Sequence, residues 1–203
     1  MVRAGLTAAR LTEAAADLAD EVGFDAVTVS AVARRFGVAD ASLYSHVRNR
    51  EDLLTRVAVR AATDFADAIA AAVAGRSGRE ALVAFADAYR TFVLTHPGRY
   101  AATQFRVDPA VLAGSAGHQR LIDLTYAMMR GFALPEPDRT DAVRLLRSSF
   151  HGFAVLEAAG GFGHPRDVTA SWRRAVTGLA HLLENWPARD TDDERDGERE
   201  EDR

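Results

Sequence analysis

The sequence contains no cysteine, no lysine and no long apolar run. The absence of cysteine excludes disulfides and thiolate metal sites. A membrane-spanning helix needs about 20 consecutive apolar residues, which the chain does not have. Acids interleaved with the apolar positions of residues 1–23 exclude a signal peptide. We therefore expect a soluble, cytoplasmic protein with no membrane partner.

Positive charge comes from arginine alone and is unevenly distributed. The formal net charge is −4, but residues 188–203 hold nine acids against four arginines. Residues 28–60 hold six arginines against three acids. A polyanion responds to local rather than total charge, so this early segment is a candidate for contact with nucleic acid. The acidic tail is expected to be disordered.

Apolar residues recur at helical spacing and never alternate as in strands, so the sequence predicts an all-α fold. An N-terminal helix is expected over about 7–22, followed by two short helices on either side of Gly37. A long helix begins near Asn49, with Glu51 and Asp52 at its positive end. Further helices are expected at about 79–95, 98–105, 109–132, 138–159 and 167–186.

Two short helices joined by a glycine turn form a helix-turn-helix, whose second helix enters the major groove of DNA. Thr28 is a good N-cap for the first helix and Asp40 for the second. Small or polar residues on the second helix allow its backbone to approach the bases, and serine can pair with either base type. Asp40 could instead read a cytosine amino group. The base-facing candidates are Ala39, Asp40, Ala41, Ser42 and Ser45.

Phosphate contacts are expected at the ends of these helices. Tyr44, His46 and Arg50, beside the second helix, can donate hydrogen bonds to DNA phosphates. Thr28, with the free N–H groups at the start of the first helix, forms another anion site. The alternative is a compact helical corner that touches no DNA. The apolar positions do not decide between the two interpretations, because they fit either.

The run TVSAVARRFGVADASLYSHVRNREDLL, residues 28–54, resembles the DNA-binding domain of TetR-family transcriptional regulators. Three positions depart from the family pattern: Val47 replaces a phenylalanine, Ala41 a common glycine and Arg50 a common lysine. The resemblance covers about residues 7–55. The matching positions are Leu43, Tyr44, His46, Asp52, Leu53 and Leu54, and Arg50 keeps the charge of the basic position that it occupies.

The resemblance implies a homodimer on a pseudo-palindromic double-stranded DNA operator, with one recognition helix per subunit in successive major grooves. It also implies a C-terminal domain that binds a small-molecule effector. We accordingly divide the chain into a helix-turn-helix domain (1–50), a ligand-binding and dimerisation domain (51–187) and the tail (188–203). The segment 149–153 is similar to the tryptophan–histidine–glycine (WHG) type of TetR C-terminal domain, with Phe150 in the place of the tryptophan.

Bulky side chains lie among many alanines in the C-terminal half, which can leave a cavity between helices. Taken singly, each of them is more often a core residue than a ligand contact. Together they favour a mainly apolar or aromatic effector, oriented by His151, Tyr89 or Tyr126. The ligand-binding candidates are Tyr89, Phe92, Phe105, Tyr126, Met129, Phe150 and His151.

The last two predicted helices carry apolar stripes that could form a four-helix dimer interface. Burial of these stripes within the monomer is the alternative. The stripes consist of Val143, Leu146, Phe150, Phe153 and Ala154 on the first helix, and of Val176, Leu179, Ala180 and Leu183 on the second.

Catalysis finds no support in the sequence. The glycines of 160–163 lack the lysine and the preceding strand of a phosphate-binding loop. His181 and Glu184 share a helix face, but two ligands do not complete a metal site. We predict no enzyme activity, no metal and no cofactor.

The sequence therefore predicts a ligand-responsive DNA-binding regulator, in the first instance a repressor that an apolar or aromatic effector releases from its operator. The ligand would tilt the long helix near Asn49 and so change the roughly 34 Å spacing of the two recognition helices. The alternative is a helical dimeric ligand-binding or interaction module without DNA-binding activity.

Overall fold

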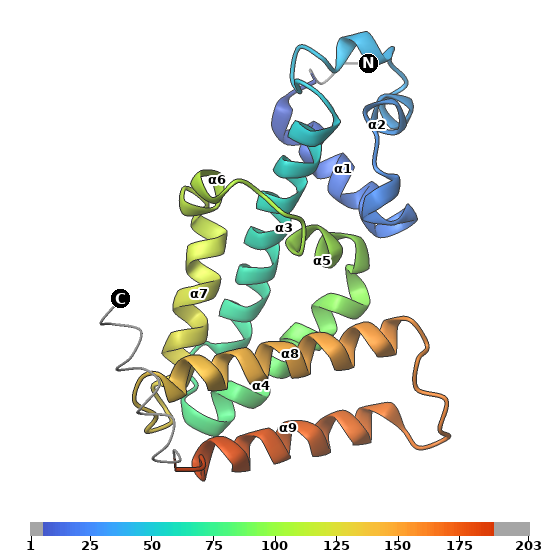
Figure 1. Ribbon diagram of the computed structural model, residues 1–203. Helices are drawn as coiled ribbons and strands as arrows, with labels where there is room; N and C mark the ends of the chain where they lie inside the picture. The colour runs from blue at the N-terminus through green and yellow to red at the C-terminus, as the bar shows by residue number, and fades with distance from the viewer. Residues whose placement is uncertain (1–5, 189–203) are drawn as a thin grey trace, which may run out of the picture.

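The computed structural model describes residues 6–188, and over that range the chain is helical and without strands (Figure 1). The all-α prediction is thereby confirmed. Two short 3₁₀ helices, η1 (Phe24–Ala26) and η2 (Asp40–Ser42), accompany the α-helices. The α-helices are α1 (Ala8–Val22), α2 (Val29–Phe36), α3 (Arg50–Val73), α4 (Gly78–Thr95), α5 (Pro97–Thr103), α6 (Pro109–Ala113), α7 (Ala116–Met129), α8 (Asp138–Ala158) and α9 (Val168–Glu184).

Helix α3 connects the two ends of the molecule. Helices α1 and α2 form a small unit at one end, and α3 runs from this unit into the larger bundle (Figure 1). In the bundle α7 lies along α3, and α8 and α9 run antiparallel to each other on the outer side of α4.

Two hydrophobic cores meet within α3. Leu53, Val57 and Ala61 belong to the N-terminal core, whereas Phe65 and Ile69 of the same helix belong to the C-terminal core. A tilt of α3 would therefore move both cores, because side chains in a close-packed interior cannot slide past one another freely.

Helix α5 belongs to the C-terminal half but packs against α1. A Cβ atom on Gly98 would lie 1.9 Å from the carbonyl oxygen of Ala19, so only glycine allows this approach of the two backbones. Further along α5, Ala102 is fully buried in the N-terminal core. Helix α5 is thus a direct connection between the two halves.

The predicted helix over 109–132 is wrong as a single element. It is divided into α6 and α7 at Gly114 and Ser115. The side chain of Ser115 accepts a hydrogen bond from the backbone N–H of His118 and so caps a new helix. The break lets α7 pack closely on α3, where a Cβ atom on Gly117 would lie 2.5 Å from Thr63 Oγ1.

The predicted dimer stripes lie mainly inside the monomer. Leu146, Phe150 and Ala154 of α8, with Val176, Ala180 and Leu183 of α9, are buried in the C-terminal core. Val143, Phe153 and Leu179 are half-buried against it. For most of these side chains the alternative, burial within the monomer, therefore holds, because α8 and α9 pack against α4.

Within residues 6–188, no helix is long and apolar enough to cross a membrane. The predicted disorder of the acidic tail concerns residues that, apart from Ala188, lie outside the described part of the chain.

Candidate DNA-binding and effector-binding sites

The turn after α2 has the geometry of a helix-turn-helix. Gly37 ends α2 in the left-handed conformation (φ 65°, ψ 34°), and the N–H of Val38 donates to the carbonyl of Ala33 at 3.1 Å. Leu43 and Val47 are then buried in the N-terminal core. These contacts fix the orientation of the segment 39–46, which carries most of the predicted DNA contacts.

The second helix of the motif is a 3₁₀ helix followed by turns. Only Asp40–Ser42 are helical, as a 3₁₀ helix, and hydrogen-bonded turns continue over residues 43–46. Asp40 does not cap this helix, since Ala39 occupies the N-cap position and makes no side-chain cap. The Asp40 carboxylate accepts instead a hydrogen bond from the Ser30 hydroxyl of α2. It therefore ties the two helices of the motif together.

The remaining base-facing candidates are on the surface. Ala39, Ala41, Ser42 and Ser45 are exposed. The hydroxyl of Ser45 donates to the carbonyl of Ser42 at 3.0 Å, which leaves its oxygen able to accept a further bond. The structure thus brings small and polar side chains together on one exposed segment.

The residues predicted to contact DNA phosphates differ in their exposure and in their hydrogen bonds within the chain. Tyr44 is 56% exposed and His46 is half-buried. Thr28 caps α2, because its Oγ1 accepts the backbone N–H of Ala31 at 3.1 Å. Arg50 is occupied within the chain: its Nε donates to the carbonyl of Val27 at 2.9 Å and its Nη2 to that of Asp25 at 2.7 Å. Arg50 thus attaches the start of α3 to the loop before α2.

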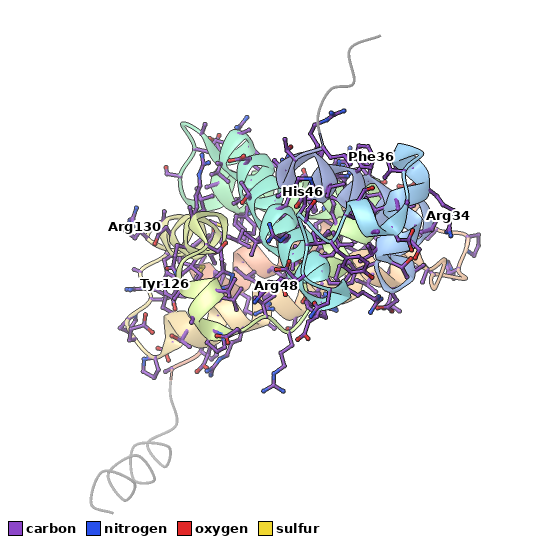
Figure 2. All side chains as sticks on the ribbon, turned by 90° about the horizontal axis from the view of Figure 1, so that it is seen from above. Arg34, Phe36, His46, Arg48, Tyr126 and Arg130 are labelled. Carbon is purple, nitrogen blue, oxygen red and sulfur yellow. The ribbon has the colours of Figure 1, made fainter. Side chains whose placement is uncertain are left out.

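Arg48 is a cation at this surface that the sequence analysis did not single out. Its side chain is 85% exposed, and its one ion pair, with Asp52, is long at 3.4 Å. Figure 2, which looks down on the DNA-binding end, places His46 and Arg48 between Arg34 on one edge and Tyr126 and Arg130 on the other. In the sequence, only the place of Arg48 in the arginine-rich segment 28–60 could have indicated this role.

Asn49 and Asp52 fix the entry into α3. The side chain of Asn49 accepts the N–H of Asp52 at 2.8 Å, and Asp52 Oδ2 accepts the N–H of Arg48 at 3.0 Å. Burial by itself raises the pKa of the Asp52 carboxyl. The bonds from Arg48 and Arg56 outweigh burial, so the pKa lies below its ordinary value of 3.8.

Asp52→Asn is expected to lower the free energy of unfolding by about 1 kcal/mol at neutral pH. Because the folded-state pKa of Asp52 is lowered, its contribution is present above pH 3.8 and is lost as the pH falls through the folded-state value. Urea melts of both proteins between pH 7 and pH 3 would check this. A difference that persists unchanged at the acid end would contradict the assigned role.

A mainly apolar cavity of about 200 Å³ lies in the C-terminal bundle between α3, α4, α7 and α8. The end of α5 completes it with Thr103 and Gln104. Ile122 and Tyr126 of α7 are 39% and 36% exposed, so the cavity reaches the surface beside α7. The other lining residues are Ala62, Phe65, Phe85, Tyr89, His118, Leu121, Thr125, Met128, Val143, Leu146, Arg147 and Phe150.

Three of the seven predicted ligand contacts, Tyr89, Tyr126 and Phe150, line this cavity, and four do not. Phe92 packs on Phe65 in the core, with ring centroids 4.8 Å apart. Phe105 stacks edge-on against Phe24 in the N-terminal core, and Met129 is fully buried. Helical spacing alone cannot separate a ring in a cavity wall from one in the core.

His151 reaches the cavity only through two tyrosines. Its Nδ1 lies 2.6 Å from the hydroxyl of Tyr100, which lies 2.5 Å from that of Tyr89. Burial raises the pKa of both tyrosines, and the Tyr89 hydroxyl raises that of Tyr100 further. Both phenols are therefore neutral at physiological pH, and Tyr89 contributes a polar but uncharged group to the wall.

A cluster of charges attaches α5 to α1 and α3. Arg99 is 7% exposed, and its backbone N–H donates to Asp20 at 2.8 Å. Its guanidinium pairs with Asp20 and with Asp17 at 2.7 Å, both on α1, and with Asp64 of α3 at 3.3 Å. Burial by itself lowers the pKa of Arg99, but the carboxylates of Asp17 and Asp20 outweigh it and raise the pKa above its ordinary value. The cluster connects the cavity-bearing half to the DNA-binding half.

The outer side of α8 and α9 forms an apolar groove. Gly152 on α8 and Gly178 on α9 face open space, where a Cβ atom would meet nothing within 4 Å. A glycine inside a helix lowers the stability of the helix by about 1 kcal/mol relative to alanine. No close contact among the described residues requires a glycine at either position. The groove residues used below are Ser149, Phe153, Ala175, Gly178, Leu179 and Leu182.

Residues 11–57 match the family model of bacterial regulatory proteins of the tetR family, and residues 82–179 match the Tetracyclin repressor-like C-terminal domain. The chain is 32% identical over 184 residues to the HTH-type transcriptional regulator YobS of Bacillus subtilis, covering 90% of this chain and 96% of that protein.

Two solved structures share the fold. A possible TetR family regulator from Streptomyces coelicolor has a TM-score of 0.69 at 21% identity, covering 89% of this chain and 100% of that one. A TetR variant from Acinetobacter baumannii in complex with minocycline has a TM-score of 0.64 at 20% identity, covering 91% and 100%. The family contains transcriptional regulators and not enzymes. The chain therefore belongs to the TetR family of DNA-binding transcriptional regulators.

Proposed function

We propose that the protein is a homodimeric repressor that a small molecule in the C-terminal cavity releases from DNA. One observation carries the proposal: the cavity wall includes both α3 and the end of α5, and α5 is attached to α1 of the DNA-binding unit through Arg99. A ligand that fits the cavity better in one arrangement of these helices would favour that arrangement.

The ligand would act through α5 as well as α3. Thr103 and Gln104 touch the cavity at one end of α5, and Arg99 lies one turn earlier on the same helix. A shift of α5 would therefore be passed directly to α1. The earlier expectation of a tilting α3 is compatible with this, because both helices pack on α1. In the Acinetobacter baumannii neighbour, the same fold is in complex with minocycline.

For DNA recognition, we propose that Ala39, Ala41, Ser42 and Ser45 face the bases. Tyr44, His46 and the start of α2 at Thr28 would contact phosphates. Arg48 joins them, since it is cationic and exposed. Asp40 and Arg50 would support the surface rather than read it, because Ser30 and two backbone carbonyls occupy their side chains.

Arg48→Gln is expected to weaken binding to operator and to unrelated DNA by the same factor. It should also reduce the salt dependence of log K by about one unit, as the loss of one phosphate contact predicts. Ser45→Ala should instead weaken operator binding alone. Fluorescence anisotropy with both DNAs over a range of salt concentrations would measure these effects.

Arg130→Gln is the matched control, since Arg130 is exposed but lies at an edge of the molecule away from Arg48 (Figure 2). It should leave both affinities unchanged. Loss of operator binding alone in Arg48→Gln would show that Arg48 reads bases, against the proposal.

Dimerisation is assigned to the outer groove of α8 and α9. Its small and apolar residues would pack against the same groove of a second copy, which gives a self-complementary interface. Phe153 and Leu179 belong both to this groove and to the predicted apolar stripes, whose other side chains are mostly buried in the core of one chain.

A mobility-shift experiment with DNA from upstream of the gene tests the whole proposal. We expect one retarded complex with two subunits per operator, dissociated by a ligand of the cavity. A ligand that binds the protein and leaves the complex intact would contradict release by that ligand.

A further inference from the structure

Among residues 6–188, one formally charged side chain lines the cavity. It is that of Arg147 on α8, and no aspartate or glutamate of the described residues lines the cavity. Other arginines of α8 are paired with acids on the surface: Arg139 lies 3.5 Å from Glu136 and Arg144 lies 3.4 Å from Asp141. Within residues 6–188, Arg147 makes no ion pair or hydrogen bond. Among the arginines of α8, Arg147 is therefore the one without an acidic partner in this range.

The other polar groups around the cavity offer no negative charge to Arg147. The hydroxyl of Thr103 donates to the carbonyl of Tyr100, and that of Thr125 to the carbonyl of Leu121. His118 and Tyr126 bring groups that can donate hydrogen bonds. Tyr89 is kept neutral by burial. The electrostatic character of the wall is therefore positive.

The remainder of the wall is apolar and aromatic. Phe65, Phe85, Leu121, Leu146 and Phe150 come from four different helices. Such a surface favours a hydrocarbon or aromatic body by removing it from water. Arg147 is exposed, so with a wholly neutral ligand bound its guanidinium would be paired only with water, whereas an anionic group would form a charge-assisted and commonly bidentate hydrogen bond with it.

We propose that the cavity binds a small amphipathic anion, with an apolar or aromatic body between α3, α4, α7 and α8 and a carboxylate-like group on Arg147. The inference rests on the proposed function only in taking the cavity as the effector site. It narrows the predicted apolar or aromatic effector to its acidic members.

Two matched pairs of probes test the charge preference: octanoate against octanol, and phenylbutyrate against phenylbutanol. Isothermal titration calorimetry on the full chain measures binding without DNA. The wild type should bind the acid of at least one pair about tenfold more tightly than the alcohol, the size of one charge-assisted hydrogen bond. Arg147→Gln should remove this preference and leave alcohol binding unchanged.

Arg144→Gln is the matched control, one helical turn earlier and outside the cavity wall. It should bind both acids as the wild type does. Arg147→Lys, which keeps the charge but not the planar fork, should retain part of the preference. If Arg147→Gln proves poorly folded, the lysine variant against the wild type still measures the contribution of the guanidinium.

Three outcomes would overturn the inference: equal binding of acid and alcohol by the wild type, unchanged acid binding by Arg147→Gln, or binding of none of the four probes. Its failure differs from that of the proposed function. Release of operator DNA by the alcohols alone would support an effector cavity and refute the anion. Tight, Arg147-dependent binding of the acids without release of DNA would support the anionic ligand and refute the effector role of the cavity.

Discussion

Arg99→Met is expected to lower the free energy of unfolding by about 3 kcal/mol, the largest effect on stability that we predict for a single side chain. Removing one partner from a buried ion-pair cluster leaves the others uncompensated, at a typical cost of 3–5 kcal/mol. Here Asp17 and Asp20 of α1 would lose their shared cation and repel each other, whereas Asp64 would keep its pair with Arg60 at 2.7 Å. Urea unfolding at neutral pH would measure the loss.

Arg79→Met is the matched control. Arg79 also connects two helices, through a bidentate pair with Glu184 at 2.7 and 2.9 Å, but this pair is on the surface. Exposed pairs contribute at most about 1 kcal/mol. Equal losses in the two variants would show that burial of Arg99 is not the source of its contribution.

The Arg99 variant also separates stability from signalling. Its ligand affinity should stay near that of the wild type, because Arg99 does not line the cavity. The effect of bound ligand on operator affinity should decrease, because the attachment of α5 to α1 is weakened. If bound ligand changes operator affinity as strongly in the variant as in the wild type, the effect of the ligand reaches the DNA-binding unit through α3 alone.

Gly178→Arg is expected to convert the proposed dimer into monomers and to lower operator affinity by about a hundredfold or more. A long charged side chain would stand where Gly178 faces open space in the groove of α9. Since two linked half-site contacts enhance each other by a factor of 10²–10⁴, a monomer forfeits that gain. Analytical ultracentrifugation and fluorescence anisotropy would measure the two losses.

Thr177→Arg tests whether position or charge is responsible. Thr177 is the neighbouring exposed residue on α9, but it is not part of the groove. Adding the same side chain there should leave the dimer and the operator affinity intact. Dissociation in both variants would point to a general effect of positive charge on α9 rather than to the groove.

The sequence predicted most of the helices because their signals are local. Thr28 and Asn49 cap their helices in the structure, and Gly37 ends α2 with positive φ, as the pattern indicated. The break at Ser115 was missed, although serine is a good N-cap, because the apolar pattern continues through it. The 3₁₀ and turn geometry of the recognition segment was likewise not predicted, because helical spacing does not report which residues are hydrogen-bonded.

The sequence by itself determined the all-α fold, the helix-turn-helix and the family, since these depend on periodicity, caps and a contiguous motif. Only the tertiary structure decided the roles of the arginines. Arg50 bonds to backbone carbonyls and Arg99 lies among carboxylates. Arg48 is exposed, and Arg147 borders the cavity with no acid partner among residues 6–188. The physical reason is that the role of a charge depends on which opposite charges and apolar groups come near it. In this chain the partners of Arg50 and Arg99 include groups more than 20 positions away along the sequence.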